Sequence, residues 1–267
     1  MNAFLAAFWA EALKARRSKV SLVTAAAFSI FPIIGGLFMM IMRDPEGARA
    51  MGLIGAKAQL LSGGRADWPA YFDFLSVGTA GGGAILFAFV TAWVFGREFS
   101  DHTAKELLAL PTPREIIVAA KFVVAALWIV GLAILIFALG LGIGAAIGLE
   151  GWSIELGWTS FWMLIITVLL TLLLMPFVAL FASAGRGYLS PLAWAFSTLG
   201  LAQVAGLMGW SDWFPWAVPA QFSLMFSVVY GQRAVPLGIH SYILLVLTCI
   251  VGAAATFAWW LRADQAR

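Results

Sequence analysis

Long uncharged apolar runs alternate with short polar segments along almost the whole chain. Each run holds about 20 residues or more, enough for an α-helix to cross a hydrocarbon core of about 30 Å. The pattern predicts six membrane-spanning helices, at about 20–42, 74–95, 122–149, 156–184, 188–209 and 241–261. We therefore expect an all-α integral membrane protein, with residues 1–267 forming a single transmembrane domain.

Composition supports the membrane assignment. The chain is 63% hydrophobic and 11% charged, with a mean hydropathy of +0.96, whereas soluble domains are about 45–50% apolar and 25% charged. The formal net charge of +3 fits basic edges that face anionic lipid and gives no indication of nucleic-acid binding. Cys249 is the only cysteine, which excludes an intrachain disulfide.

The first 19 residues differ from the spans. One helical stripe carries Leu5, Phe8, Trp9, Ala12 and Leu13, while Glu11 and the basic residues lie mostly off it. This pattern predicts a helix in the membrane interface, with its basic face toward the headgroups. The alternative is a basic flank that only fixes topology. No short apolar region with a small-residue cleavage site precedes the first span, so we expect no signal peptide.

The most polar stretch, residues 96–121, lies between the second and third spans. Ser100 or Asp101 can cap a short helix. Its apolar positions would be i, i+3 and i+4: Ala104, Leu107 and Leu108. Thr112-Pro113-Arg114-Glu115 combines a capping box with proline at N1 and begins the helix that continues into the third span. We expect a short amphipathic helix outside the membrane.

Residues 210–240 are apolar but contain Pro215, Pro219, Gly231 and Pro236. Such a segment is too interrupted to span the membrane, and it predicts re-entrant or interfacial half-helices with aromatic side chains at the surface. An ordinary extracellular loop is the alternative. Pro176 predicts a kink in the fourth span.

Topology follows from the distribution of positive charge. Six spans place both termini on one side of the membrane, and that side also holds residues 96–121 and most of the 16 basic residues. The positive-inside rule assigns this side to the cytoplasm.

The sequence lacks the common signatures of catalysis and energy coupling. It contains no GxxxxGK[ST], GxSxG or HExxH motif, and none of the six predicted apolar cores contains Asp, Glu, Lys or Arg. Ion-coupled carriers usually depend on such intramembrane groups. We expect no catalytic, cofactor-binding or metal-binding residue, and energy for transport would have to come from a partner.

The polar stretch also resembles a known family. It is similar to the cytoplasmic loop after the second span of type 2 ABC exporter permeases in these residues: Gly96-Arg97-Glu98, Thr103-Ala104, Leu107-Leu108-Ala109-Leu110-Pro111, Pro113-Arg114 and Lys121. The amino-terminal Glu11-x-x-Lys14-x-Arg16-Arg17-Ser18 resembles the start of those subunits. The predicted architecture matches the family over essentially the whole chain.

The resemblance implies a coupling helix at Ser100–Leu110 that docks on a separate ATP-binding subunit. It implies two copies of that subunit, which bind the ATP, and a second permease copy that forms a homodimer. The location implied is the bacterial inner membrane, as a multi-pass protein with both termini in the cytoplasm. The coupling residues expected are Glu98, Ser100, Thr103, Ala104, Glu106, Leu107, Leu108, Pro111 and Arg114.

The function indicated is a permease subunit of an ATP-driven exporter rather than an enzyme. A path lined by Phe, Met, Leu and Gly favours an amphipathic or hydrophobic substrate, such as a peptide antibiotic, a drug or a lipid-linked molecule. Two alternatives stay open at this point: a secondary carrier, and an assembly or immunity factor that transports nothing.

Overall fold

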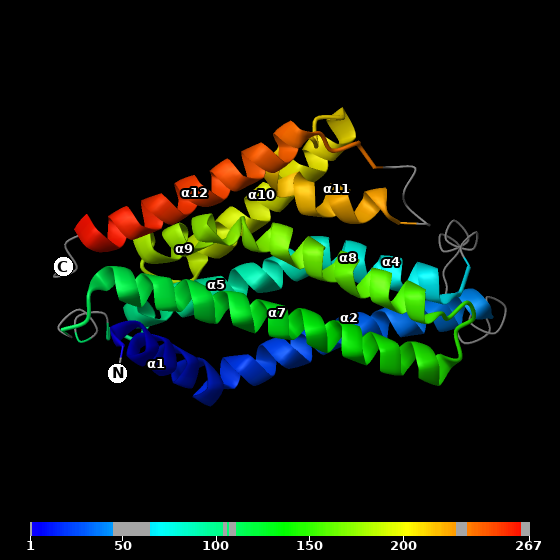
Figure 1. Cartoon of the computed structure of the whole chain (residues 1–267), viewed down its shortest axis with the longest axis horizontal. Coiled ribbons are helices and arrows are strands. Elements are labelled where there is room, and N and C mark those ends of the chain that lie inside the picture. Colours follow the sequence, from blue (N-terminus) through cyan, green and yellow to red (C-terminus); the bar gives the residue numbers. More distant parts are fainter. Residues whose placement is uncertain (1, 45–64, 104–105, 107–110, 228–233, 263–267) are drawn as a thin grey trace.

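The chain forms an elongated helical bundle whose described amino-terminal and carboxy-terminal segments lie at the same end (Figure 1). The computed structural model describes residues 2–44, 65–103, 106, 111–227 and 234–262. These ranges contain no strand, and six of their helices or helix pairs are long and apolar enough to cross a membrane. The prediction of an all-α fold with six spans is therefore confirmed.

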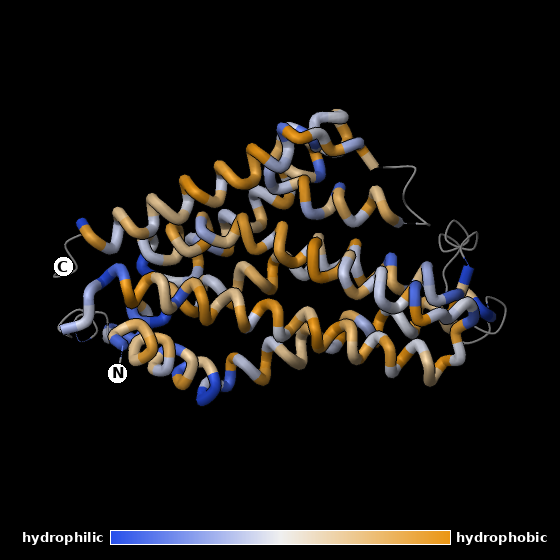
Figure 2. Tube along the Cα trace, in the orientation of Figure 1, coloured by the Kyte–Doolittle hydropathy of each residue, from blue (hydrophilic) through white to orange (hydrophobic). Residues whose placement is uncertain are grey.

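The helices have the following bounds: α1 Ala3–Arg17, α2 Lys19–Arg43, α4 Trp68–Gly78, the π-helix η2 Thr79–Gly83, α5 Ala84–Ser100, α7 Arg114–Ile147, α8 Ile154–Leu172, α9 Met175–Ala184, α10 Leu189–Met208, the 3₁₀-helix η3 Pro215–Ala217, α11 Val218–Met225 and α12 Ile239–Arg262. The six candidate spans are α2, α4 to α5, α7, α8 to α9, α10 and α12. Hydrophobic residues predominate along the length of these helices (Figure 2).

The second span begins earlier than the pattern of apolar residues predicts. The Asp67 carboxylate accepts a hydrogen bond from the Ala70 N–H at 3.0 Å, and Pro69 occupies the first turn, so the helix begins at Trp68. Asp73 consequently lies within a span.

Two neighbouring spans are interrupted. The second contains the π-helix η2, whose sequence is Thr-Ala-Gly-Gly-Gly. The fourth ends its first helix at Leu172 and resumes at Met175, immediately before Pro176. Proline removes one backbone donor and clashes with the preceding turn, which explains the break that Pro176 predicts.

Helix α7 lies at the centre of one half of the bundle, where it packs against α1, α2, α4, α5, α8 and α12. Helix α9 has a similar place in the other half, against α5, α10 and α12. Close packing of α7 on α4 requires Gly144, because a Cβ there would lie 2.5 Å from the Trp68 ring.

Helix α1 does not present a simple apolar stripe to the bundle. Leu5 and Trp9 are 55% and 65% exposed, whereas Glu11 is buried and only 6% exposed. Burial of Glu11 has a specific cause, because its carboxylate pairs with a lysine of α7. Glu11 therefore lies off the apolar stripe, as the pattern predicts, but it faces the bundle, and the place of α1 in the membrane interface stays a prediction.

The segment between α10 and α12 contains the short helices η3 and α11. Helix α11 packs against α8 and α4. Gln221 donates to the Ser211 hydroxyl at 3.1 Å and accepts from the Val235 N–H at 2.9 Å, which connects both flanks of the segment. Its depth in the membrane stays a prediction.

Candidate functional site: a buried ion-pair network

The end of the bundle that holds the amino terminus also holds the connection between α5 and α7. Helix α5 ends at Ser100 and α7 begins at Arg114. Of the expected coupling residues, Ala104, Leu107 and Leu108 lie outside the described residues. The residues on both sides of this connection are described, and they contain an unusual group of charges.

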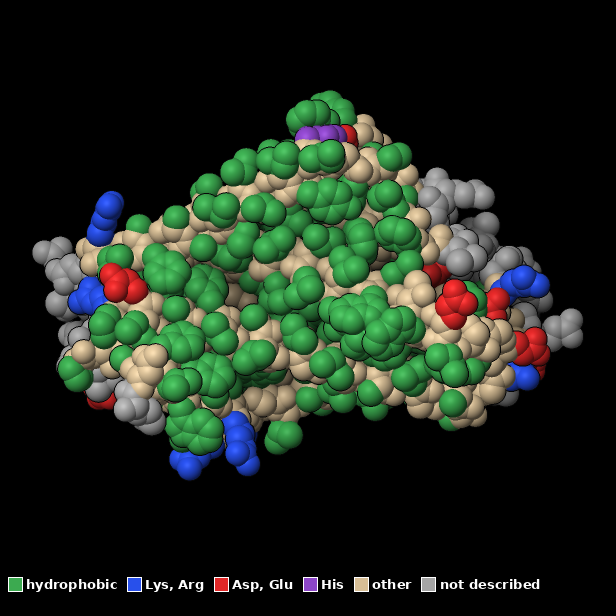
Figure 3. Space-filling model, viewed as in Figure 1, with side chains coloured by type: hydrophobic (Ala, Val, Ile, Leu, Met, Phe, Trp, Pro, Cys, Tyr) green, Lys and Arg blue, Asp and Glu red, His purple; other side chains and the backbone are tan. Residues whose placement is uncertain are grey.

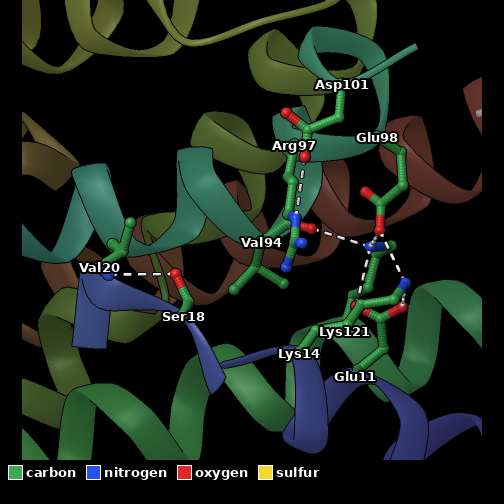
Figure 4. A network of polar contacts seen from close by, with 9 residues as sticks. All are labelled: Glu11, Lys14, Ser18, Val20, Val94, Arg97, Glu98, Asp101 and Lys121. Carbon is green, nitrogen blue, oxygen red and sulfur yellow. Dashed lines mark hydrogen bonds and ion pairs between the residues drawn. The ribbon is translucent and has the colours of Figure 1, made fainter. Parts of the chain in front are cut away.

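Lys121, in the second turn of α7, is fully buried. Its ammonium donates to Glu98 Oε1 at 2.8 Å, to Glu11 Oε2 at 3.0 Å and to the Val94 carbonyl at 2.9 Å (Figure 4). A lysine ammonium has three N–H donors, so every donor of this buried group has an acceptor.

Lys14 completes a four-residue network. Its ammonium lies 2.6 Å from Glu11 Oε1 and 3.0 Å from Glu98 Oε1, so each carboxylate contacts both lysines. Two carboxylates and two ammonium groups give no net charge. Neutrality matters because an unpaired buried charge is costly, whereas a complete set of paired charges is tolerated.

Three separate helices position this network. Glu11 and Lys14 lie one turn apart on α1, Glu98 is in the last turn of α5, and Lys121 is near the start of α7. Residues 101–113 connect the end of α5 to the start of α7. The network therefore joins both ends of this connection to α1. Glu98 Oε2 is buried without a hydrogen-bond partner in the described part of the chain.

The other expected coupling residues have different surroundings. Ser100, Thr103, Glu106 and Pro111 are exposed, and the Thr103 N–H donates to the Glu98 carbonyl at 2.9 Å. Arg114 donates to the Trp260 carbonyl at 3.2 Å, which fixes the start of α7 to the end of α12.

Glu98 and Arg114 therefore make contacts within the chain itself. The structure brings Glu98 together with Lys121, and it leaves Ser100, Thr103, Glu106 and Pro111 at the surface.

The end of α5 also lies against the tight turn between α9 and α10. A Cβ added to Gly96 would lie 3.0 Å from the Gly187 carbonyl oxygen, so glycine permits this close backbone approach. Tyr188 follows the turn, and burial raises the pKa of its phenol.

Sequence reasoning identified Glu98 as a site residue but missed its partners. Lys121, Lys14 and Glu11 were noted within the resemblance, but no contact among them or with Glu98 was expected. The available signal was a single lysine at the edge of a long apolar run, since a cation in that position needs a counter-charge. Nothing in the spacing shows that the counter-charges are Glu98 and Glu11.

The fold and surface define the class of protein. Hydrophobic side chains cover most of the visible face, and most charged side chains lie toward its two ends or at its edges (Figure 3). Together with six apolar helices, this surface defines a multi-pass membrane protein.

The family is shown by comparison with known sequences. The family model of the ABC-2 family transporter protein matches residues 7–200, and the chain belongs to this family of ABC transporter permeases. Membership implies a transport component whose partner is an ABC ATP-binding subunit. Comparison with curated proteins and with solved structures gives no significant match.

Proposed function

We propose that this chain is the permease subunit of an ATP-driven exporter and that the connection at 101–113 is its contact with the ATP-binding subunit. The observation that carries the proposal is the buried network of Glu11, Lys14, Glu98 and Lys121. A surface connection on which a partner exerts force needs a firm attachment to the spans, and the network provides one on both sides.

The network explains how movement reaches the bundle. Tightly packed elements move as rigid bodies rather than deforming continuously. A displacement of the connection therefore moves the ends of α5 and α7 together, and the ion pairs transmit that movement to α1. We expect two ATP-binding subunits and two permease copies in the cell membrane, with this end of the bundle in the cytoplasm. The chain itself requires no cofactor, because the partner binds ATP.

The substrate expected is amphipathic or hydrophobic, because the spans are predominantly apolar. One small cavity lies beside both interrupted spans, and its lining is mostly apolar apart from Thr171 and Thr198. Its volume is about 20 Å³, room for roughly one water molecule. This conformation is closed to a larger substrate, and passage requires the helices around the cavity to separate.

Co-purification with an ATP-binding subunit tests the proposed docking surface. We expect Glu106→Lys, or a bulky polar residue at position 107, to reduce the ATPase activity recovered with the solubilised chain. Glu155→Lys is the matched control, because Glu155 is exposed at the opposite end of the bundle. Unchanged recovery with the first two variants would contradict docking at 101–113.

The role of the network needs a separate measurement. Lys14 is partly exposed, and Lys121 still pairs with both carboxylates when Lys14 is changed. We expect Lys14→Gln to leave assembly with the ATP-binding subunit intact and to reduce substrate moved per ATP hydrolysed in proteoliposomes. An unchanged transport-to-hydrolysis ratio would show that the network only stabilises the fold.

Export is tested in the same proteoliposomes. We expect a fluorescent amphipathic peptide to move in the direction away from the ATP-binding face, and transport to persist after proton and sodium gradients are collapsed. Loss of transport on collapse would instead indicate a secondary carrier.

A further inference from the structure

We propose that a cavity between α1 and the end of α5 binds the headgroup and the adjoining acyl region of one anionic phospholipid. The cavity has a volume of about 270 Å³ and opens at the surface. Its walls are formed by Ala10, Leu13, Lys14, Arg17, Ser18 and Arg97. Five of these residues follow one another at i, i+3, i+4, i+7 and i+8, so a single face of α1 and its cap forms one wall and Arg97 forms the other.

The polar part of the cavity is cationic. Lys14, Arg17 and Arg97 line it, and none of the lining residues is acidic. The Lys14 ammonium already pairs with Glu11 and Glu98, so Arg17 and Arg97 supply the cationic groups available to a ligand. In the described part of the chain Arg17 makes no ion pair, and Arg97 uses only Nε in its pair with Asp101 at 3.1 Å. The terminal amino groups of both guanidinium groups can therefore bind phosphate oxygens, for which their planar arrangement is well suited.

Ser18 adds a further polar group to this wall. Its hydroxyl oxygen accepts a hydrogen bond from the Val20 N–H at 3.1 Å. Its own hydrogen can donate to a phosphate oxygen, because an accepting hydroxyl keeps its donor.

The apolar part distinguishes a lipid from a free anion. Ala10 and Leu13 line the cavity, and Leu5 and Trp9 are largely exposed further along α1. An inorganic anion gains nothing from these groups, whereas glycerol and acyl carbons of a phospholipid pack on them.

Position in the fold also favours a lipid. Ser18 immediately precedes the span Lys19–Arg43, and Arg97 lies in the last turn of the span Trp68–Ser100. The cavity therefore lies at the level where two spans leave the apolar core, which is the level of the phosphate groups. Basic pockets between helices at this depth on the cytoplasmic side bind anionic headgroups in other membrane proteins.

The chain offers a matched control for non-specific attraction. Arg16 and Lys19 are exposed cations within two residues of Arg17, yet neither lines the cavity. A diffuse electrostatic effect would depend equally on all three cations. A specific site depends on Arg17 and on the free space beside Leu13.

Native mass spectrometry of the full chain, released from nanodiscs of equal parts phosphatidylglycerol and phosphatidylcholine, tests the proposal. We expect one retained phosphatidylglycerol per chain in preference to phosphatidylcholine. Arg17→Gln should weaken retention about fivefold, the factor that corresponds to one cation near an anionic lipid. Leu13→Trp should also reduce retention, because it fills the cavity without changing charge, and Arg16→Gln should have no effect.

Three results would overturn the proposal. Equal losses with Arg16→Gln and Arg17→Gln would show diffuse attraction, and equal retention of the two lipids would show no headgroup recognition. Displacement of phosphatidylglycerol by millimolar inorganic phosphate would show a free-anion site. Circular dichroism and size-exclusion profiles of the variants, compared with the unchanged chain, confirm that each variant is folded before its lipid retention is scored.

Discussion

The two ends of the bundle differ in their buried charges, although aromatic side chains pack at both. At the end with α1, four charged side chains are buried together and pair with one another. At the other end Trp68, Phe72 and Trp152 pack ring against ring, and the Trp68 N–H donates to the Glu150 carbonyl at 3.0 Å. Charged side chains are visible on the surface at that end (Figure 3), and Asp73 of α4 is half-buried and accepts a hydrogen bond from the Ser227 hydroxyl at 2.8 Å.

The aromatic cluster and the charge network differ in how well they tolerate substitutions. An aromatic cluster loses energy in proportion to the area that a substitution removes, and the remaining rings still pack. The charge network is less tolerant, because loss of one member leaves the remaining buried charges unbalanced. The end proposed to receive force from the ATP-binding subunit is thus the end that allows the fewest alternative arrangements.

The largest effect is expected from Lys121→Met. Two buried carboxylates would then share only Lys14, and breaking a buried pair costs about 3–5 kcal/mol. Thermal unfolding of the detergent-solubilised chain measures the loss, with Lys19→Met as the control because Lys19 is exposed at the same end. Adding Glu98→Gln should recover part of the stability, since Glu11 and Lys14 remain as a pair. Equal unfolding temperatures for Lys121→Met and Lys19→Met would contradict the network.

An intermediate loss of stability is expected from Tyr71→Phe, at the end of the bundle that contains Trp68 and Phe72. The buried Tyr71 hydroxyl donates to the Pro32 carbonyl at 2.9 Å and connects α4 to α2. Removal of one such hydrogen bond costs about 1 kcal/mol, while the ring keeps its packing. The same thermal assay should place this variant between Lys121→Met and the unchanged chain. A loss as large as that of Lys121→Met would show that the two ends do not differ in the way described.

The smallest effect is expected from Asp101→Asn. This carboxylate pairs with Arg97 but is 51% exposed, and such pairs contribute about 0.5 kcal/mol or less. The difference from the unchanged chain should disappear in high salt, because salt screens exposed charges. A loss that persists in high salt would indicate that Asp101 has a structural role beyond this pair.

Much of the fold is predictable because each span is a local property of the sequence. An uncharged run long enough to cross the bilayer has few alternatives to a helix. The start of the second span was misplaced because Asp73 interrupts the apolar run, although Asp67 and Pro69 contain the capping signal. Local capping chemistry is thus a better guide to this boundary than hydropathy.

The network could not be predicted in the same way. Glu11 and Lys121 are separated by 110 residues, and their contact depends on how α1 packs on α7. On a helical wheel Glu11 belongs to the polar face of α1, and only the partner across the interface shows that it faces the bundle. The residues that carried the family resemblance include Glu11, Lys14, Glu98 and Lys121, so two motifs that are distant in sequence prove to be one spatial cluster.

The π-helix Thr79–Gly83 marks a position at which one residue could be deleted without rotating the flanking helices relative to each other. A π turn holds one residue more than an α turn, so the helices on either side keep their faces although an extra residue separates them. Gly81 has open space around the position of a Cβ. Deleting this single residue should therefore restore a continuous α-helix and leave the Trp68 and Glu98 faces in phase, whereas a deletion one turn away would rotate one face by about 100°. In an alignment of relatives, a one-residue gap here would mark a helix without the bulge rather than a different fold.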